Sequence, residues 1–233
     1  MYNRDYLSNQ SSQYTQESSQ VQLMSFLKAT YQLFAGSLLA ATAGSYIGLG
    51  IVSYLMGGIK WVLFGAVIAM VWFVIPRVKH KPGINLLALF ALTFMTGLMI
   101  APLLASIFAM PGGASIVGQA FLMTSVAFGG ISMFAMTTKR DFSSMGKFLF
   151  IALIIMIVAG ISNIFIQSSL FQLAIASAGA LLFSAFILYD TQNIIKGNYD
   201  SPVEAALSLY LDFFNLFVSL LQILGIMNSG DKE

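Results

Sequence analysis

Residues 84–110 read INLLALFALTFMTGLMIAPLLASIFAM, a stretch of 27 residues without a charged side chain. A helix of roughly 20 apolar residues crosses a hydrocarbon core about 30 Å thick, so this stretch is long enough to span a membrane. The whole chain of 233 residues has the matching composition, with 58% hydrophobic residues, 9% charged residues and a mean hydropathy of +0.84. A soluble domain of this size needs more charge to cover its surface. The sequence therefore indicates a membrane protein.

Apolar runs of this kind recur along the chain, and short connectors with turn-forming residues separate them. We predict an all-α fold of seven transmembrane helices, at residues 33–55, 59–75, 84–110, 114–136, 148–166, 170–189 and 203–227. None of the connectors could hold a second domain. Residues 1–24 are rich in Ser and Gln and are expected to be a disordered tail. The transmembrane domain would occupy residues 25–228, and residues 229–233 would form a short C-terminal tail.

Basic residues are distributed unevenly between the two sides of this predicted bundle. With the N-terminal tail and every second connector on one side, nine Lys and Arg residues collect there and two lie opposite. The nine are Arg4, Lys28, Arg77, Lys79, Lys81, Lys139, Arg140, Lys147 and Lys196, and the two are Lys60 and Lys232. The positive-inside rule then places the N-terminus in the cytoplasm and, with seven spans, the C-terminus outside.

Charge and composition also exclude several functions. A net charge of +2, with no basic run interleaved with aromatic residues, argues against nucleic-acid binding. Cys is absent and His80 is the single histidine, so thiolate chemistry and His-based metal sites are excluded. We expect no cofactor.

Two carboxylates fall inside apolar runs, Asp190 and Asp212. An ionised Asp at the bilayer centre costs on the order of 2.5 to 3.5 kcal/mol, so such residues usually face a partner or a wet cavity. Gly197 is a natural helix C′ residue, and Ser201 before Pro202 is a natural N-cap, which places both carboxylates within reach of each other across a helical hairpin. Two adjacent carboxylates cannot easily both ionise, so we predict a pH-sensing pair. Hydrogen bonding between helices, with no further role, is the structural alternative.

The last helix also carries a polar stripe. Its residues are spaced by four, three, four and three positions, so they share one face of the helix. The polar stripe consists of Ser208, Asp212, Asn215, Ser219 and Gln222. Such a row of oxygen atoms suits a hydrated cation, and these residues are candidates to line a pore; packing into the centre of the bundle is the alternative. In the first helix, Gly44 and Gly48 form a pattern typical of close helix contact.

Several segments resemble the Bax inhibitor-1 (transmembrane Bax inhibitor motif) family, in particular its bacterial members. The similar segments are residues 137–146 (TTKRDFSSMG), 163–165 (NIF), 188–190 (LYD) and 206–217 (ALSLYLDFFNLF). The resemblance implies six helices around a central seventh, in the bacterial cytoplasmic (inner) membrane. It also implies a pH-sensitive calcium leak, gated by the pair Asp190 and Asp212, with calcium as a permeant ion passing near them. A basic residue of the second helix, Arg77 or Lys79, would latch onto Asp190.

Two other functions stay open. A second bacterial branch of the family is similar to modulators of a membrane-anchored ATP-dependent protease, and a polar N-terminal tail could contact such a partner. An intramembrane aspartyl protease would also place one Asp on each of two adjacent helices. The Gly-x-Gly-Asp element that such proteases share is missing around Asp212, so we predict that the protein is not an enzyme.

Overall fold

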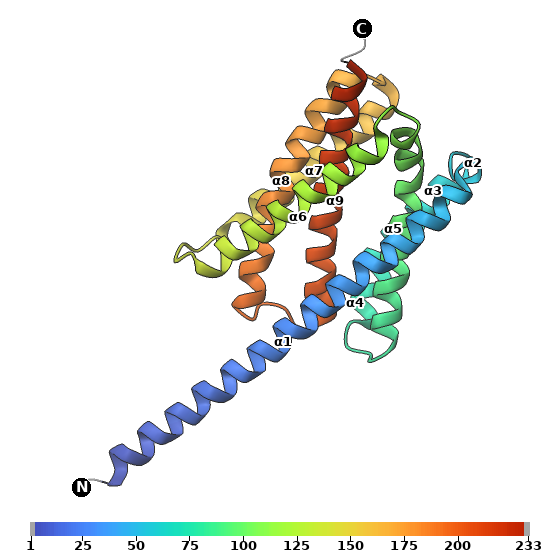
Figure 1. Ribbon diagram of the computed structural model, residues 1–233. Helices are drawn as coiled ribbons and strands as arrows, with labels where there is room; N and C mark the ends of the chain where they lie inside the picture. The colour runs from blue at the N-terminus through green and yellow to red at the C-terminus, as the bar shows by residue number, and fades with distance from the viewer. Residues whose placement is uncertain (1–2, 231–233) are drawn as a thin grey trace.

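The computed structural model describes the backbone of residues 3–230, which is helical apart from its connectors (Figure 1). Seven helices are long and apolar enough to cross a membrane, which confirms the predicted all-α, seven-span fold. The spans are Gln20–Gly50 of α1 (Asn3–Gly50); Ile59–Val78, made of α3 (Ile59–Ala69), η1 (Met70–Val74) and α4 (Ile75–Val78); Ile84–Phe108 (α5); Gly113–Thr137 (α6); Ser143–Ile166, made of η2 (Ser143–Met145) and α7 (Gly146–Ile166); Ser169–Ile195 (α8); and Pro202–Ser229 of α9 (Pro202–Gly230). The short helix α2 (Val52–Leu55) lies in the first connector.

The backbone from residue 3 to residue 24, where the sequence led us to expect a disordered tail, is helical and continuous with the first span. The reason is that Gly36 is the first glycine of the chain and no proline precedes it. Extending an existing helix avoids the cost of nucleating a new one, so a polar segment of this composition can continue α1. Side chains are described from Gln20 onward.

The second span contains a local departure from α-helical geometry, the π-helical segment η1. Pro76 follows it in the first turn of α4 and has no amide hydrogen to donate to the carbonyl of Trp72, four residues earlier. A π-helical turn is a common way to accommodate such an interruption. The span therefore continues to Val78 without losing its helical course.

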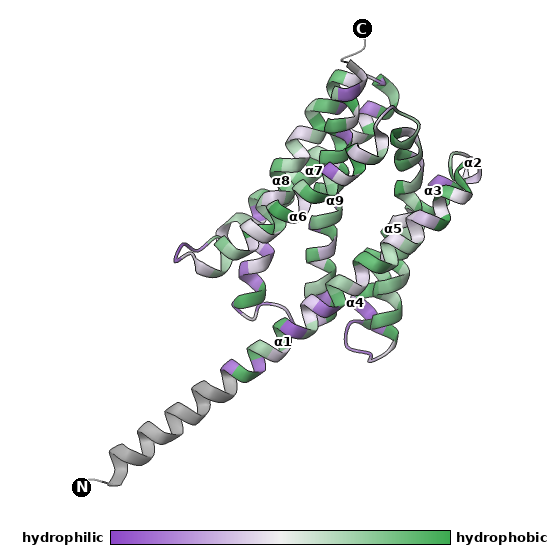
Figure 2. Cartoon of the chain, viewed as in Figure 1, coloured by the Kyte–Doolittle hydropathy of each residue, from purple (hydrophilic) through white to green (hydrophobic). Residues whose placement is uncertain are grey.

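Hydrophobic residues cover the outside of the bundle as well as its interior (Figure 2). In the second span and in α7 most apolar side chains are exposed, including Trp61, Trp72 and Phe165. Lipid is as apolar as these side chains, so outward-facing hydrophobic residues are stable there. Polar residues gather in the connectors and at the ends of the helices (Figure 2).

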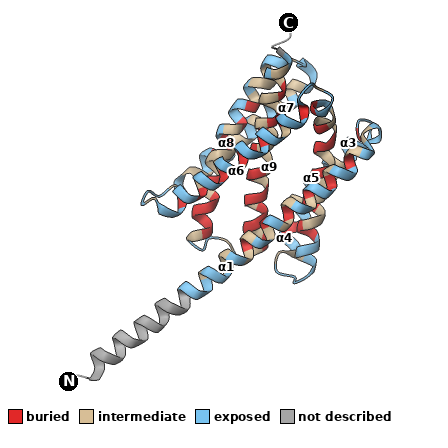
Figure 3. Ribbon diagram, in the orientation of Figure 1, coloured by how far each residue is buried: buried red, intermediate tan, exposed pale blue. Residues whose placement is uncertain are grey.

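Helix α9 occupies the interior of the bundle and packs against α1, α5, α6 and α8 (Figures 1 and 3). Its buried side chains include Tyr210, Phe213, Leu216 and Leu221. The second span packs on α5, and α7 packs on α8, so both lie toward the outside. Polar groups in the middle of α9, such as Asp212 and Ser219, are therefore buried among other helices.

Helices α1 and α5 approach closely through glycine. A Cβ atom added to Gly44 would lie 2.1 Å from the carbonyl oxygen of Phe94, and one added to Gly97 would lie 2.1 Å from that of Ala41. The close contact predicted at Gly44 is present, and Gly97 is its counterpart on the facing helix. Small residues permit this backbone approach, which is a main source of helix association in membranes.

Candidate ion site at the α8–α9 hairpin

The turn between α8 and α9 fixes the position of both helix ends. Gly197 has a φ of 71°, and its N–H donates to the carbonyl of Ile194 while the N–H of Asn198 donates to that of Asn193. These two bonds form a Schellman motif. At the start of α9, the Oγ of Ser201 accepts from the N–H of Val203 at 3.2 Å. The helix end and the N-cap expected from the sequence are thus both present.

Asp190 of α8 and Asp212 of α9 face each other across this hairpin. Their carboxyl groups lie close enough to interact, and the two residues are only 7% and 4% exposed. Oδ2 of Asp212 has no hydrogen-bond donor among the residues whose side chains the structure describes. A buried polar atom without a partner is costly, so this oxygen is available for a proton or a cation.

Tyr199, in the connector between the two helices, completes the site. Its hydroxyl oxygen lies 2.9 Å from Oδ1 of Asp190 and 2.9 Å from Oγ of Ser208. Burial, together with the nearby charge of Asp190, raises the pKa of Tyr199 well above its usual range, so the hydroxyl stays protonated at neutral pH. The sequence reasoning missed this residue, because its position depends on the conformation of the turn.

The two candidate latch residues lie elsewhere in this structure. Lys79 donates to Oδ2 of Asp200 at 3.0 Å and to Oε2 of Glu204 at 3.3 Å, and so ties the end of the second span to the start of α9. These bonds lower the pKa of Asp200 and raise the pKa of Lys79. Arg77 donates to the carbonyl of Phe73 at 2.6 Å. Among the ion pairs of the described residues, none reaches Asp190 or Asp212.

The polar stripe of α9 is divided among several partners. Ser208 contacts Tyr199, while Asn215 donates to the carbonyl of Leu211 in its own helix at 2.7 Å. Ser219 is buried beside Gly179 of α8. Gln222 accepts from Gln172 at 2.8 Å, and Gln172 accepts from Asn163 at 2.7 Å, which joins α9, α8 and α7. The stripe therefore contains interhelical hydrogen bonds as well as the carboxylate.

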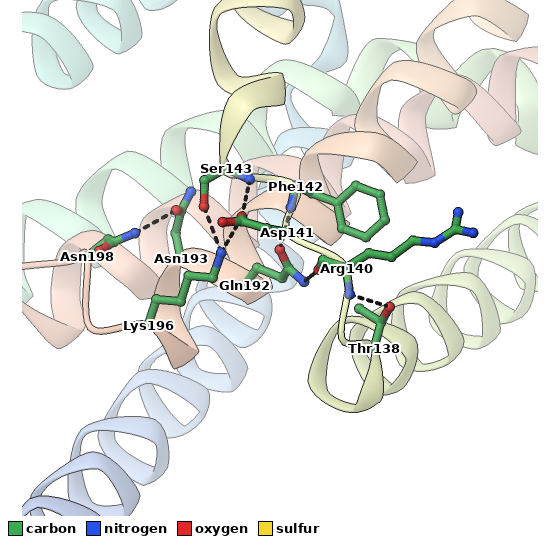
Figure 4. Close-up of polar contacts among 9 residues, drawn as sticks. All are labelled: Thr138, Arg140, Asp141, Phe142, Ser143, Gln192, Asn193, Lys196 and Asn198. Carbon is green, nitrogen blue, oxygen red and sulfur yellow. Dashed lines mark hydrogen bonds and ion pairs between the residues drawn. The ribbon is translucent and has the colours of Figure 1, made fainter.

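A second polar cluster fastens the α6–α7 connector to the end of α8 (Figure 4). The side chain of Gln192 accepts from the N–H of Phe142 at 2.9 Å and donates to the carbonyl of Arg140 at 2.7 Å. Lys196 forms an ion pair with Asp141 and donates to Oγ of Ser143 at 2.8 Å. The ion pair lowers the pKa of Asp141 well below its usual range. The connector is thus held on the same helix that carries Asp190.

Replacing Gln192 with alanine is expected to release this connector. The substitution removes both hydrogen bonds to the backbone of Arg140 and Phe142, each worth about 0.5 to 1.5 kcal/mol. Hydrogen–deuterium exchange at residues 140–145 should become roughly 10 to 100 times faster, since each 1.4 kcal/mol corresponds to about a factor of ten. Gln119→Ala is the matched control, because exposed Gln119 donates to Ser115 on its own helix and does not hold a connector. Unchanged exchange in Gln192→Ala would contradict this role.

The donor set limits what the site can hold. Within residues 20–229, no group of three or more Asp, Glu, His or Cys side chains is placed to hold a metal ion. The two carboxylates supply fewer than the roughly six to eight oxygen ligands that Ca²⁺ takes. Water would have to complete the shell of any bound calcium ion.

Comparisons with known proteins agree with this architecture. Residues 23–229 match the family model described as inhibitor of apoptosis-promoting Bax1. The chain is 50% identical to an uncharacterised protein of Campylobacter jejuni, over 98% of this chain and 99% of the relative. It is 40% identical to an uncharacterised membrane protein of Vibrio cholerae, over 88% and 91% of the two chains. It is 33% identical to a Golgi anti-apoptotic protein of vaccinia virus, over 88% and 86%. With its seven spans, the chain is a multi-pass membrane protein and belongs to the Bax inhibitor-1 family.

Proposed function

We propose that this protein is a pH-sensitive, calcium-permeable leak channel of the bacterial cytoplasmic membrane, gated by the carboxyl groups of Asp190 and Asp212. The observation that carries the proposal is the buried contact between these two groups. Two ionised carboxylates in contact inside a membrane are strongly unfavourable unless a proton or a cation lies between them. A proton and a calcium ion would compete for the same place.

This competition sets the direction of the pH effect. At low pH a proton shared by Asp190 and Asp212 holds α8 and α9 together, and calcium is excluded. At high pH the proton leaves, the two charges repel, and a divalent cation can enter between them. The hydroxyl of Tyr199, which contacts Asp190, and that of Ser208, which contacts Tyr199, supply further oxygen atoms for an ion in transit. Flux should therefore increase as the pH rises.

The proposed orientation follows from the positions of the basic residues. Lys79, Lys139, Arg140 and Lys196 all belong to connectors or helix ends on the side of the α8–α9 turn. This side would face the cytoplasm, with the N-terminus on the same side and the C-terminus outside. The carboxylate pair then lies nearer the cytoplasmic surface, because Asp190 is five residues before the end of α8.

Calcium entry into liposomes that contain purified protein tests the proposal. We expect protein-dependent flux to rise between pH 6 and pH 8 by at most about tenfold per pH unit, since one proton controls the gate. Asp141→Asn is the control, because it makes the same chemical change in an exposed connector and should leave the pH profile unchanged. If no protein-dependent flux appears at any pH, the proposal that the protein is a channel is wrong. Copurification with a membrane-anchored ATP-dependent protease would then be the next measurement.

A further inference from the structure

A large cleft lies between α1 and α6, on the side of α9 away from the carboxylate pair. It has a volume of about 830 Å³. Its floor is an aromatic stripe of α9, formed by Tyr210, Phe213, Phe214 and Phe217. Helix α1 packs on α5 and α9, and α6 packs on α8 and α9. The two helices meet where the rings of Phe34 and Phe128 stack at 4.9 Å, and elsewhere they bound the cleft on its two sides.

The aromatic stripe and the polar stripe occupy opposite faces of α9. Residues two apart on an α-helix differ in direction by about 200°, so Asp212 points away from the side of Tyr210. Tyr210, Phe213 and Phe217 follow one another at intervals of three and four and share one face. The cleft is therefore a separate site from the proposed ion path.

Water is a poor occupant of this cleft. Of the polar side chains in its wall, Thr42 donates to the carbonyl of Leu38 at 2.8 Å, and Ser45 donates to that of Thr42 at 2.9 Å. Tyr46 is 80% exposed and so lies at the rim. The hydroxyl of Tyr210 is bonded to Thr96. An ordered water needs about two to four polar partners, which this wall does not offer.

The rim of the cleft is continuous with the surface that faces lipid. Leu39, Phe108 and Phe121 line the cleft and are 72%, 45% and 52% exposed. Leu122 and Val126 continue the exposed apolar surface along α6. At about 30 Å³ for each water-sized group, the cleft has room for roughly 25 to 30 methylene-sized groups. This capacity fits hydrocarbon tails of a membrane lipid.

We propose that the cleft between α1 and α6 binds an acyl chain of a bilayer phospholipid, seated on the aromatic stripe of α9. The acyl chain enters from the bilayer past Leu39 and Phe121, both of which are exposed. It contacts Phe217 and Phe213 at the floor. Bound lipid fills space that would otherwise be empty, which supports the separation of α1 from α6.

A fluorescence measurement tests this site. The only tryptophans, Trp61 and Trp72, lie on the second span and are replaced by Phe, and Phe217→Trp then places a single reporter in the cleft. The protein is reconstituted in phosphatidylcholine vesicles with increasing fractions of lipid brominated on its acyl chains. We expect saturable quenching of the reporter, approaching that of the lipid-exposed tryptophans in the unmodified chain.

Two glycines of α6 provide a matched pair of blocking variants. A Cβ atom added at Gly118 or Gly130 meets no atom within 4 Å, so both positions have room for a side chain, and of the two only Gly118 lines the cleft. Gly118→Leu should reduce the quenching at least twofold, and Gly130→Leu should leave it unchanged. Native mass spectrometry of the otherwise unmodified chain should show fewer retained phospholipids with Gly118→Leu than with Gly130→Leu. An unquenched reporter, or equal behaviour of the two leucine variants in both measurements, overturns the proposal.

Discussion

Replacing Asp212 with asparagine is expected to abolish the pH dependence of calcium flux. The asparagine cannot exchange a proton with Asp190, so the contact between α8 and α9 no longer changes charge between pH 6 and pH 8. Flux across this range should vary by less than about twofold, whereas one controlling proton allows up to about tenfold per pH unit in the wild type. Calcium entry into liposomes, followed with an entrapped indicator dye, measures the profile.

The partner substitution provides the internal control for this prediction. Asp190→Asn should flatten the profile in the same way, and the double variant should resemble either single variant, because the two carboxyl groups act as one unit. A pH-dependent flux that persists in both single variants would show that another group controls the gate. Additive effects in the double variant would contradict a shared proton.

Replacing Gly97 with alanine should strongly destabilise the bundle. The added methyl group would lie 2.1 Å from the carbonyl oxygen of Ala41 and 2.8 Å from its carbonyl carbon, and neither backbone atom can move without shifting α1. Overpacking usually costs about 1 to 3 kcal/mol, and contact with backbone places this variant at or above the upper end. The apparent Tm in detergent, measured by loss of the monodisperse peak after heating, should fall by several degrees.

Gly160→Ala is the matched control for this stability prediction. Gly160 lies inside α7, where an added Cβ meets no atom within 4 Å. Alanine is favoured over glycine in a helix interior by about 1 kcal/mol, so this variant should be as stable as the wild type or more stable. Equal loss of stability in the two variants would mean that the α1–α5 contact is not the cause.

Much of the fold could be predicted from hydropathy, because each span is marked by its own predominantly apolar run. Pairing between spans was harder to predict. Gly44 indicates a close helix contact, but nothing in its neighbourhood identifies Gly97 as the counterpart, since they lie on helices separated by a whole span. The continuation of α1 to residue 3 could not be predicted, because the polar composition of this segment shows only that it has no apolar face to bury. It does not determine whether the backbone is helical.

The candidate site could likewise be predicted only in part. Asp190 and Asp212 could be placed near each other because Gly197 and Ser201 mark the adjoining helix ends. Tyr199 lies in the turn, where no periodic pattern indicates the direction of a side chain. The ion pairs of Lys79 with Asp200 and Glu204 could not be predicted, because Arg77 and Lys81 are basic residues two positions away and the sequence does not distinguish among the three.

The two unlike faces of α9 restrict how the protein can rearrange. Turning this helix by one residue, about 100°, would move Asp212 toward hydrocarbon and carry aromatic rings into the polar hairpin. Each movement of that kind exposes a charge or buries an unpaired hydroxyl, so the azimuth of α9 is fixed. Rearrangements that separate Asp190 from Asp212 must therefore tilt or slide α8, whose C-terminal end bears the α6–α7 connector. In such a rearrangement α9 would keep its place in the bundle, and α8 would be the helix that moves.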